Sequence, residues 1–256
     1  MKRALINVQV LNFKTAVNFL TLFPFCPRFE NRGEGGALHH AAPYFPVVGY
    51  LIAGITWAVY AACQPVFSRD LNALVLVFLP LILSGGLHAD GFADFCDGFF
   101  GGRSREETLQ IMKDPHLGAW GVLGLVFLIL SKFVLLKDIH SNVAALVGSV
   151  TLSRWAMVAV SYGMPYGGNA GGLAAGFAGK ITKSGMFWTT AAGWPVTAFW
   201  GVSGILVLLA VCFVAALLRI VFEKKVGGVT GDMIGAAGEI TELTVLLGIL
   251  VLERMG

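Results

Sequence analysis

Charged residues are scarce in this chain. Lys, Arg, Asp and Glu make up 13% of the 256 residues, whereas a soluble domain carries roughly a quarter. Hydrophobic residues make up 56%, and the mean hydropathy is +0.76. These values, with repeated long apolar runs, exclude an ordinary soluble domain and predict a membrane protein with several spans. The net charge of +3 is also too small to indicate a nucleic-acid partner.

Paired cysteines, repeats and flexible linkers are also missing. The four cysteines are scattered without a CxxC pair, which excludes a disulfide framework and a zinc site. They are Cys26, Cys63, Cys96 and Cys212. No low-complexity linker divides the chain, so we predict one membrane-embedded domain over residues 1–256. The first residues lack a clean apolar core with a small-residue cleavage site, so we expect no cleaved signal peptide.

Six or seven apolar segments have the length of about 20 residues that a bilayer requires. They are residues 44–66, 71–89, 118–136, 143–162, 186–202, 203–219 and 232–252. Gly201 and Gly204 are expected to mark the turn between the fifth and sixth of these segments. Residues 4–23 look amphipathic and carry Lys14, which predicts an N-terminal interfacial helix. The predicted fold class is therefore all-α, a polytopic integral membrane helical bundle.

The distribution of Lys and Arg predicts the orientation in the membrane. With a cytoplasmic N-terminus, thirteen of the eighteen basic residues fall inside. They are Lys2, Arg3, Lys14, Arg28, Arg32, Arg103, Arg105, Lys113, Lys180, Lys183, Arg219, Lys224 and Lys225. Only Arg69, Lys137 and Arg254 fall outside, while Lys132 and Arg154 lie within spans. Residues 90–117 are therefore expected at the cytoplasmic face.

Three aspartates follow one apolar segment in GGLHADGFADFCDGFFGG, residues 85–102. On a helix, Asp90, Asp94 and Asp97 would lie at about 0°, 40° and −20°, in one narrow stripe. Such close carboxylates repel one another and are costly to desolvate. A divalent cation would offset both costs, and oxygen-only ligands suit Mg²⁺ or Mn²⁺. A solvated carboxylate cluster and a transporter cation or proton site are the alternatives.

Basic residues beside this stripe favour phosphate chemistry. Arg103, Arg105 and Lys113 follow it closely, and a metal with cations is the usual means of stabilising phosphoryl transfer. The alternative is that cytoplasmic loops are basic for topological reasons. Arg154 lies mid-span, where an unpaired arginine is expensive. We expect it to meet a substrate phosphate or the aspartates, with a structural ion pair as the alternative.

A second acidic stripe lies in GGVTGDMIGAAGEITELTVLL, residues 227–247. Asp232, Gly235 and Glu239 fall at i, i+3 and i+7 of one helical face, and small residues there would let the helix pack closely against another. This stripe would complete a metal site if it faced the first one. Alternatively, Thr230 and Asp232 cap the last helix.

Three blocks of the sequence resemble the cobalamin synthase family of adenosylcobinamide-GDP ribazoletransferases. They are HADGFADFCDGFFGG, RSREETLQIMKDPHLGAWG and GGVTGDMIGAAGEITE, and the resemblance extends over nearly the whole chain. It implies a multi-pass enzyme of the bacterial cytoplasmic (inner) membrane, with its active site toward the cytoplasm. The reaction implied joins adenosylcobinamide-GDP to α-ribazole or its 5′-phosphate and releases GMP, with Mg²⁺ as cofactor. The lipid bilayer is the other expected partner, and a homo-oligomer is compatible with the sequence.

The resemblance also implies roles for individual residues. Asp90, Asp94 and Asp97 would hold the metal, and Asp232 would complete that site. Glu239 or Asp232 would take the proton of the attacking hydroxyl. Three cations would contact substrate phosphates, namely Arg103, Lys113 and Arg154.

Two features depart from related patterns. Asp94-Phe-Cys-Asp97-Gly98 resembles the opening of the CDP-alcohol phosphatidyltransferase motif, but Gly101 and Gly102 stand where that family has Ala-Arg. This makes a CDP-alcohol-type phosphotransferase an alternative function. Cobalamin synthases commonly carry an arginine two residues after the tyrosine that matches Tyr166, where this chain has Gly168. If that arginine contacts phosphate in the family, Lys180 or Lys183 would have to serve here. A cation- or proton-coupled transporter, the other alternative, predicts internal repeats that the sequence lacks.

Overall fold

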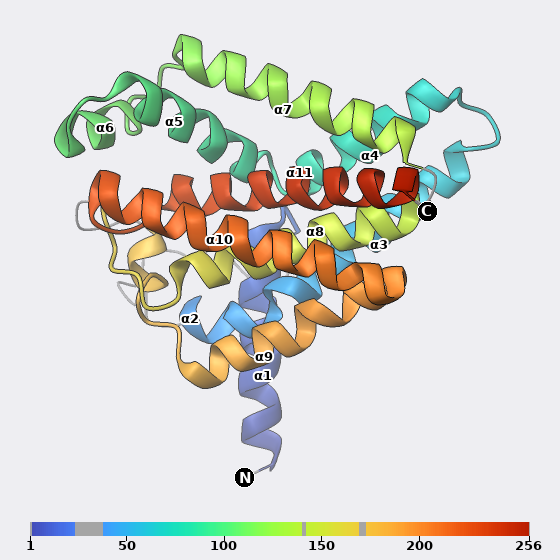
Figure 1. Cartoon of the computed structure of the whole chain (residues 1–256). Helices are drawn as coiled ribbons and strands as arrows, with labels where there is room; N and C mark the ends of the chain where they lie inside the picture. Colours follow the sequence, from blue (N-terminus) through green and yellow to red (C-terminus); the bar gives the residue numbers. More distant parts are fainter. Residues whose placement is uncertain (1, 24–37, 140–141, 169–172, 256) are drawn as a thin grey trace.

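A computed structural model describes residues 2–23, 38–139, 142–168 and 173–255 (Figure 1). Within these ranges the chain is helical and has no β-strand, which confirms the predicted all-α class. The longer helices are α1 (Lys2–Leu20), α3 (Phe45–Cys63), α4 (Arg69–Leu83), α5 (Leu87–Gly101), α7 (Ala119–Asp138), α8 (Asn142–Ser161), α9 (Lys183–Gly193), α10 (Gly204–Val226) and α11 (Gly231–Met255). Shorter ones are α2 (Leu38–Ala41), η1 (Ala42–Tyr44), α6 (Arg105–Ile111), η2 (Leu173–Gly176) and η3 (Trp194–Ser203).

Several helices are long and apolar enough to cross a bilayer. There are five such segments in the described chain, or six if α4 and α5 together form one bent span. They are residues 38–63, 119–138, 143–161, 183–226 and 231–255. The prediction of a polytopic membrane bundle is thus confirmed. The predicted turn in the 183–226 segment is present as well, because Gly201 takes a φ of 54° and α10 then turns back (Figure 1).

The predicted span over residues 71–89 is wrong as a single straight helix. α4 ends at Leu83, α5 begins at Leu87, and the two axes differ by 90°. Gly85 and Gly86 between them have φ values of 66° and 69°. Glycine adopts this left-handed conformation at little cost, which ends the first helix and redirects the chain. The bend therefore sets the direction of the helix that carries the three aspartates.

α8 and α11 form the centre of the bundle. Of the most apolar 18-residue stretch of each helix, 78% is buried in α8 and 61% in α11, whereas only 28% is buried in α7. α11 packs against α5, α7, α8 and α10. The outer faces of α7 and α10 expose large apolar side chains such as Leu123, Phe127 and Phe213. Exposed apolar helix faces of this kind suit contact with lipid.

α1 is not among the helices apolar enough to span a membrane. Its C-terminal part is packed into the bundle at Ala16, Val17 and Leu20, while Ile6 and Leu11 are exposed. In Figure 1 it runs crosswise to α10 and α11. Its predicted interfacial position and the single domain stay predictions. Arg28 and Arg32, used for the predicted orientation, lie outside the described residues.

Candidate active site

Two glycines bring α5 and α11 into close backbone contact. A Cβ on Gly91 would lie 2.9 Å from the Cα of Asp232, and one on Gly235 would lie 3.2 Å from the Cα of His88. The pairing of 91 with 232 and of 88 with 235 shows that the helices run antiparallel. Small residues permit such close approach of helices in membranes. The predicted facing of the two acidic segments is therefore present at the start of α11.

The close contact places Asp232 next to the carboxylates of α5. Asp94 is half-buried, and the negative charges of Asp232, Asp90 and Asp97 lie close enough to act on it. Among the described residues, no Lys, Arg or His forms an ion pair with Asp90, Asp94 or Asp232. Asp90 is exposed, whereas Asp94 and Asp232 are partly buried, and carboxylates this close without a counter-charge repel one another. This crowding makes the cluster the strongest candidate for binding a cation.

Asp97 points away from this cluster toward the start of α7. Its Oδ2 accepts a hydrogen bond from the Gly118 amide at 2.8 Å, and its Oδ1 accepts one from the Gly121 amide at 2.9 Å. A Cβ on either glycine would come within 2.3 Å of the carboxylate. A negative charge at a helix N-terminus is favourable because the amides and the helix dipole both point at it. The predicted metal role of Asp97 stays a prediction, and the structure gives this carboxylate a capping role.

A cavity of about 280 Å³ adjoins the carboxylates. Asp90, His88 and Asp232 line it together with Lys113, which follows α6. The structure thus brings the predicted phosphate-binding Lys113 to the same cavity as two of the predicted metal ligands. The lining also includes Phe19, Leu109, Met157, Phe177 and Thr230. Apolar walls with a few convergent charged groups are typical of a ligand site.

The loop after α8 closes one side of the cavity. The Gly167 amide donates to the Val229 carbonyl at 3.0 Å, and the Val229 amide donates to the Pro165 carbonyl at 2.9 Å. These bonds fix Tyr166, another lining residue, beside the start of α11. Burial and the nearby negative charge of Asp232 raise the pKa of the Tyr166 phenol. Tyr166 was not predicted from the sequence, because its proximity depends on a loop contact.

Several basic residues near the cavity bind helix ends. Arg105 donates to the carbonyls of Val226 and Gly167, at 2.7 and 3.1 Å. Lys225 donates to the Gly102 carbonyl at 2.8 Å. Cations satisfy the free carbonyls at helix C-termini and interact favourably with the dipole. Part of the basic character of this end of the bundle is therefore structural.

The Arg103 side chain is exposed and is absent from the lining of the cavity. Its amide donates to Glu107 Oε2 at 2.7 Å, while Ser104 accepts from the Glu107 amide. Ser104 is thus the N-cap of α6, and Glu107 reaches back to the amide one residue before that cap. Asp114 likewise binds locally, because its Oδ1 accepts from the His116 amide at 2.9 Å. This hydrogen bond and the His116 ring lower the pKa of Asp114.

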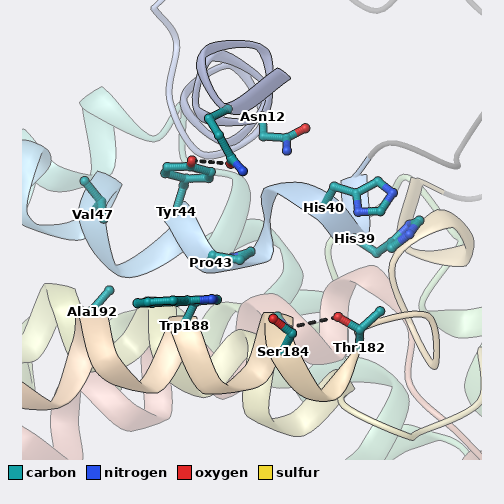
Figure 2. Close-up of a pocket in the computed structure, with 12 residues that line it drawn as sticks. Asn12, His39, His40, Pro43, Tyr44, Val47, Thr182, Ser184, Trp188 and Ala192 are labelled. Carbon is teal, nitrogen blue, oxygen red and sulfur yellow. Dashed lines mark hydrogen bonds between the residues drawn. The ribbon is translucent and has the colours of Figure 1, made fainter. Parts of the chain in front are cut away.

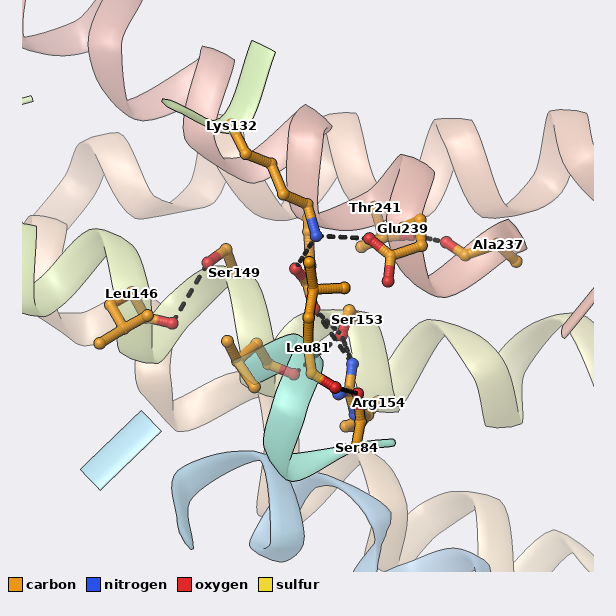
Figure 3. A network of polar contacts seen from close by, with 12 residues as sticks. Leu81, Ser84, Lys132, Leu146, Ser149, Ser153, Arg154, Ala237, Glu239 and Thr241 are labelled. Atoms are coloured by element: carbon orange, nitrogen blue, oxygen red, sulfur yellow. Dashed lines mark hydrogen bonds and ion pairs between the residues drawn. The ribbon is translucent and has the colours of Figure 1, made fainter. Parts of the chain in front are cut away.

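Arg154 and Glu239 lie elsewhere, in a buried network of charged groups. Arg154 Nη1 is 3.1 Å from Glu242 Oε1 and also donates to Ser153. Lys132 of α7 binds Glu239, and its Nζ is 2.6 Å from Glu242 Oε2 (Figure 3). Neither Arg154 nor Glu239 lines the cavity. The structure thus does not bring these two residues to the aspartates, and their predicted substrate roles stay predictions.

Lys132 and Glu242 are the partners that sequence reasoning did not assign. The sequence did indicate that such partners exist, because two cations within apolar spans, Lys132 and Arg154, require counter-charges. On a helical wheel, however, Glu242 is rotated away from the stripe of Asp232 and Glu239. The wheel compares positions on one helix only. It carries no information on whether α7 and α8 would present Lys132 and Arg154 to that side of α11.

A second cavity, of about 510 Å³, lies between α1, η1 and α9 (Figure 2). One end of it is polar, with His39, His40 and Thr182, and the other end is apolar, with Val47 and Ala192. No Asp or Glu is among its lining residues. It is larger than the first cavity, but the chemistry of carboxylates and cations is at the first one.

The described residues contain no group of three His, Cys, Asp or Glu side chains already arranged to hold a metal ion. This result concerns metal sites in which all the ligands are protein side chains. Mg²⁺ is usually held differently, by one or two carboxylates together with substrate phosphates and water. The oxygens of Asp90 and Asp232, which line the cavity, and of Asp94 close to them fit that pattern as hard ligands.

The chain is similar to proteins of one family. The family model described as cobalamin-5-phosphate synthase (CobS) matches residues 12–250. A relative from Chlorobium phaeovibrioides named adenosylcobinamide-GDP ribazoletransferase is 38% identical, over 91% of this chain and 94% of its own length. Relatives of the same name from Desulforamulus reducens and Chlorobaculum tepidum are 36% and 34% identical, over 95% and 91% of this chain and 98% and 92% of their own lengths. No solved structure matches the chain significantly.

Proposed function

This chain belongs to the CobS family of cobalamin-5-phosphate synthases and is a transferase of cobalamin biosynthesis, and from that premise we propose a specific reaction. It transfers the adenosylcobinamide-phosphate group of adenosylcobinamide-GDP to α-ribazole or to α-ribazole 5′-phosphate. A ribazole hydroxyl oxygen forms a bond to the cobinamide-linked phosphorus. The bond from that phosphorus to the bridging oxygen breaks, and GMP leaves with the bond's electron pair. The products are adenosylcobalamin, or its 5′-phosphate, and GMP.

One observation carries this proposal: Asp90 and Asp232 line the cavity, Asp94 lies within reach of both charges, and none of the three has a cationic partner among the described residues. These carboxylates would hold Mg²⁺, which, when bound, neutralises charge on the pyrophosphate and its leaving group. The chain's own carboxylates would also receive the proton of the attacking hydroxyl. Lys113, at the same cavity, would bind a phosphate oxygen. The apolar walls of the cavity would exclude water, which would otherwise compete with the ribazole hydroxyl for the phosphorus.

The proposed site faces the cytoplasm. The split of thirteen basic residues inside against three outside supports this orientation. α6, the loop at Lys113 and the junction of α10 with α11 lie together at one end of the bundle (Figure 1). A site at that end would meet polar nucleotide substrates without their crossing the bilayer.

Release of GMP tests the proposed reaction. Purified protein in lipid discs would receive adenosylcobinamide-GDP with α-ribazole or α-ribazole 5′-phosphate, in Mg²⁺ or in EDTA. We expect GMP only when both substrates and Mg²⁺ are present, and its loss in Asp94→Asn protein that still inserts and folds. Folded protein that releases no GMP would refute the proposed reaction. Full turnover in EDTA, or in the Asp94→Asn variant, would refute the metal site.

A further inference from the structure

The buried network of charged groups joins three helices inside the apolar interior of the bundle. Lys132, Arg154, Glu239 and Glu242 are exposed by 5%, 2%, 3% and 6%. They come from α7, α8 and α11, and two cations balance two carboxylates. Ser153 completes the set by donating to Glu242 at 3.1 Å. Every one of these charges has a partner within the protein.

Stability alone does not account for such a network. Removing two charges from water costs several kcal/mol per ion, and replacement of a buried ion pair by apolar side chains is often neutral or stabilising. Ionisable residues within membrane helices are therefore expected to serve function. These four residues do not line the carboxylate cavity, so they act on the site indirectly.

The surface of α11 explains what the network contributes. Around its contacts with α5 and α8 the helix presents Gly235, Ala236, Ala237 and Gly238. Small side chains let helices approach closely, but they form few ridges that would resist rotation or sliding. Polar groups buried in a helix interface can fix the register that apolar packing leaves open. The pairs of Glu239 and Glu242 with fixed partners on α7 and α8 supply that constraint.

The same helix carries the constraint to the site. Asp232 precedes Glu239 by seven residues, which is two helical turns or about 10 Å along the axis. At Gly91 the backbone of α5 lies directly against Asp232, so a shift of α11 changes the separation of Asp232 from Asp90 and Asp94. His88 of α5 lies within electrostatic reach of Arg154, Glu242 and Lys132 and also lines the cavity. The network and the site are thus adjacent along one pair of helices.

We propose that Lys132, Arg154, Glu239 and Glu242 are positioning residues for this transferase. Their ion pairs fix the rotation and height of α11 so that Asp232 faces Asp90 and Asp94. The inference rests on the proposed function for its effect on turnover. Its structural part, the register of α11 against α5, stands independently.

The test removes one ion pair without leaving a lone charge. Lys132→Met combined with Glu239→Met keeps the Arg154–Glu242 pair, whereas Lys132→Met alone leaves two buried carboxylates with one arginine. Lys132→Arg preserves the charge and is the conservative variant. Lys137→Met, also on α7, is the matched control because Lys137 forms an exposed pair with Asp70 at 2.7 Å.

Three measurements separate positioning from general stability. The first is thermal unfolding, and the second is the kcat and KM for GMP release. The third is a spin-label distance between Phe100→Cys and Val251→Cys, exposed sites on α5 and α11, with the four native cysteines replaced by alanine. A one-turn slip of α11 would change its axial position by about 5.4 Å. This distance needs no substrate, so it reports on register even if the proposed reaction is wrong.

We expect the double variant to unfold near the wild-type temperature while the spin-label distance shifts or broadens. Its kcat should fall on the order of 100-fold with a smaller change in KM, since a misplacement of about 1 Å can cost that much. Lys132→Arg should keep the wild-type distance and kcat, as should Lys137→Met. If the double variant does not insert, Glu239→Gln takes its place: it removes the charge that pairs with Lys132 at nearly unchanged side-chain size, and we expect the same change in distance and fall in kcat. Wild-type kcat and distance in a folded double variant, or in Glu239→Gln, would overturn the proposal.

Discussion

The carboxylates of Asp94 and Asp97 lie one helical turn apart on α5, yet the structure predicts opposite effects when each becomes asparagine. Asp97 accepts two hydrogen bonds from the first turn of α7, at 2.8 and 2.9 Å. Asparagine offers one oxygen, so one amide of Gly118 or Gly121 would face an NH₂ group instead. Asp94 accepts no hydrogen bond from any described residue, and the negative charges of three other aspartates act on it.

The size of the Asp97 effect follows from these contacts. A hydrogen bond to a charged group contributes about 1.5–3 kcal/mol. A charge at a partly buried helix terminus adds roughly 0.3–2 kcal/mol. Asp97→Asn loses one such bond and the charge, so we expect a loss of about 2–4 kcal/mol. Asp94→Asn removes repulsion and should leave the free energy of unfolding unchanged or raise it.

The assay compares both variants in the same lipid discs by thermal unfolding and by GMP release. Asp97→Asn should unfold at a clearly lower temperature, while its turnover well below that temperature falls less than that of Asp94→Asn. Asp94→Asn should unfold at or above the wild-type temperature with almost no turnover. The reversed pattern, a stable Asp97→Asn and an unstable Asp94→Asn, would refute the assignment of Asp97 as the cap of α7.

Three further predictions concern the surroundings of the site. Gly91→Ala places a Cβ 2.9 Å from the Asp232 Cα, so we expect a loss of about 1–3 kcal/mol by thermal unfolding and lower kcat. Gly54→Ala, also inside a helix but with no atom within 4 Å of the new Cβ, should keep kcat and should not lower the unfolding temperature. Arg105→Gln removes the hydrogen bond to the Val226 carbonyl and should speed proteolysis between α10 and α11, and an unchanged cleavage rate would contradict this role. Lys113→Ala should raise the KM for adenosylcobinamide-GDP roughly 10-fold or more, as the loss of a charge-assisted contact predicts, and an unchanged KM would place the phosphate elsewhere.

The sequence predicted the helical membrane class and most spans because those signals are local. A bilayer requires about 20 apolar residues per helix, and α3, α7, α8 and α11 lie where such runs occur. The turn at Gly201 was predicted for the same reason, since one apolar run was too long for a single helix. The bend at Gly85 and Gly86 was missed, because an apolar run looks the same whether or not the backbone turns within it.

The candidate site, too, was predicted from the sequence only in part. The sequence alone determined that the chain carries two acidic stripes and a resemblance to one family, since spacing on a helix fixes which side chains share a face. Only the tertiary structure decided which stripe members meet: Asp232 lies beside Asp94, while Glu239, two turns along the same face, pairs with Lys132. It also turned Asp97 toward the α7 amides and Arg154 toward Glu242. Helical periodicity describes each helix by itself, whereas these contacts depend on where neighbouring helices place their charges and amides.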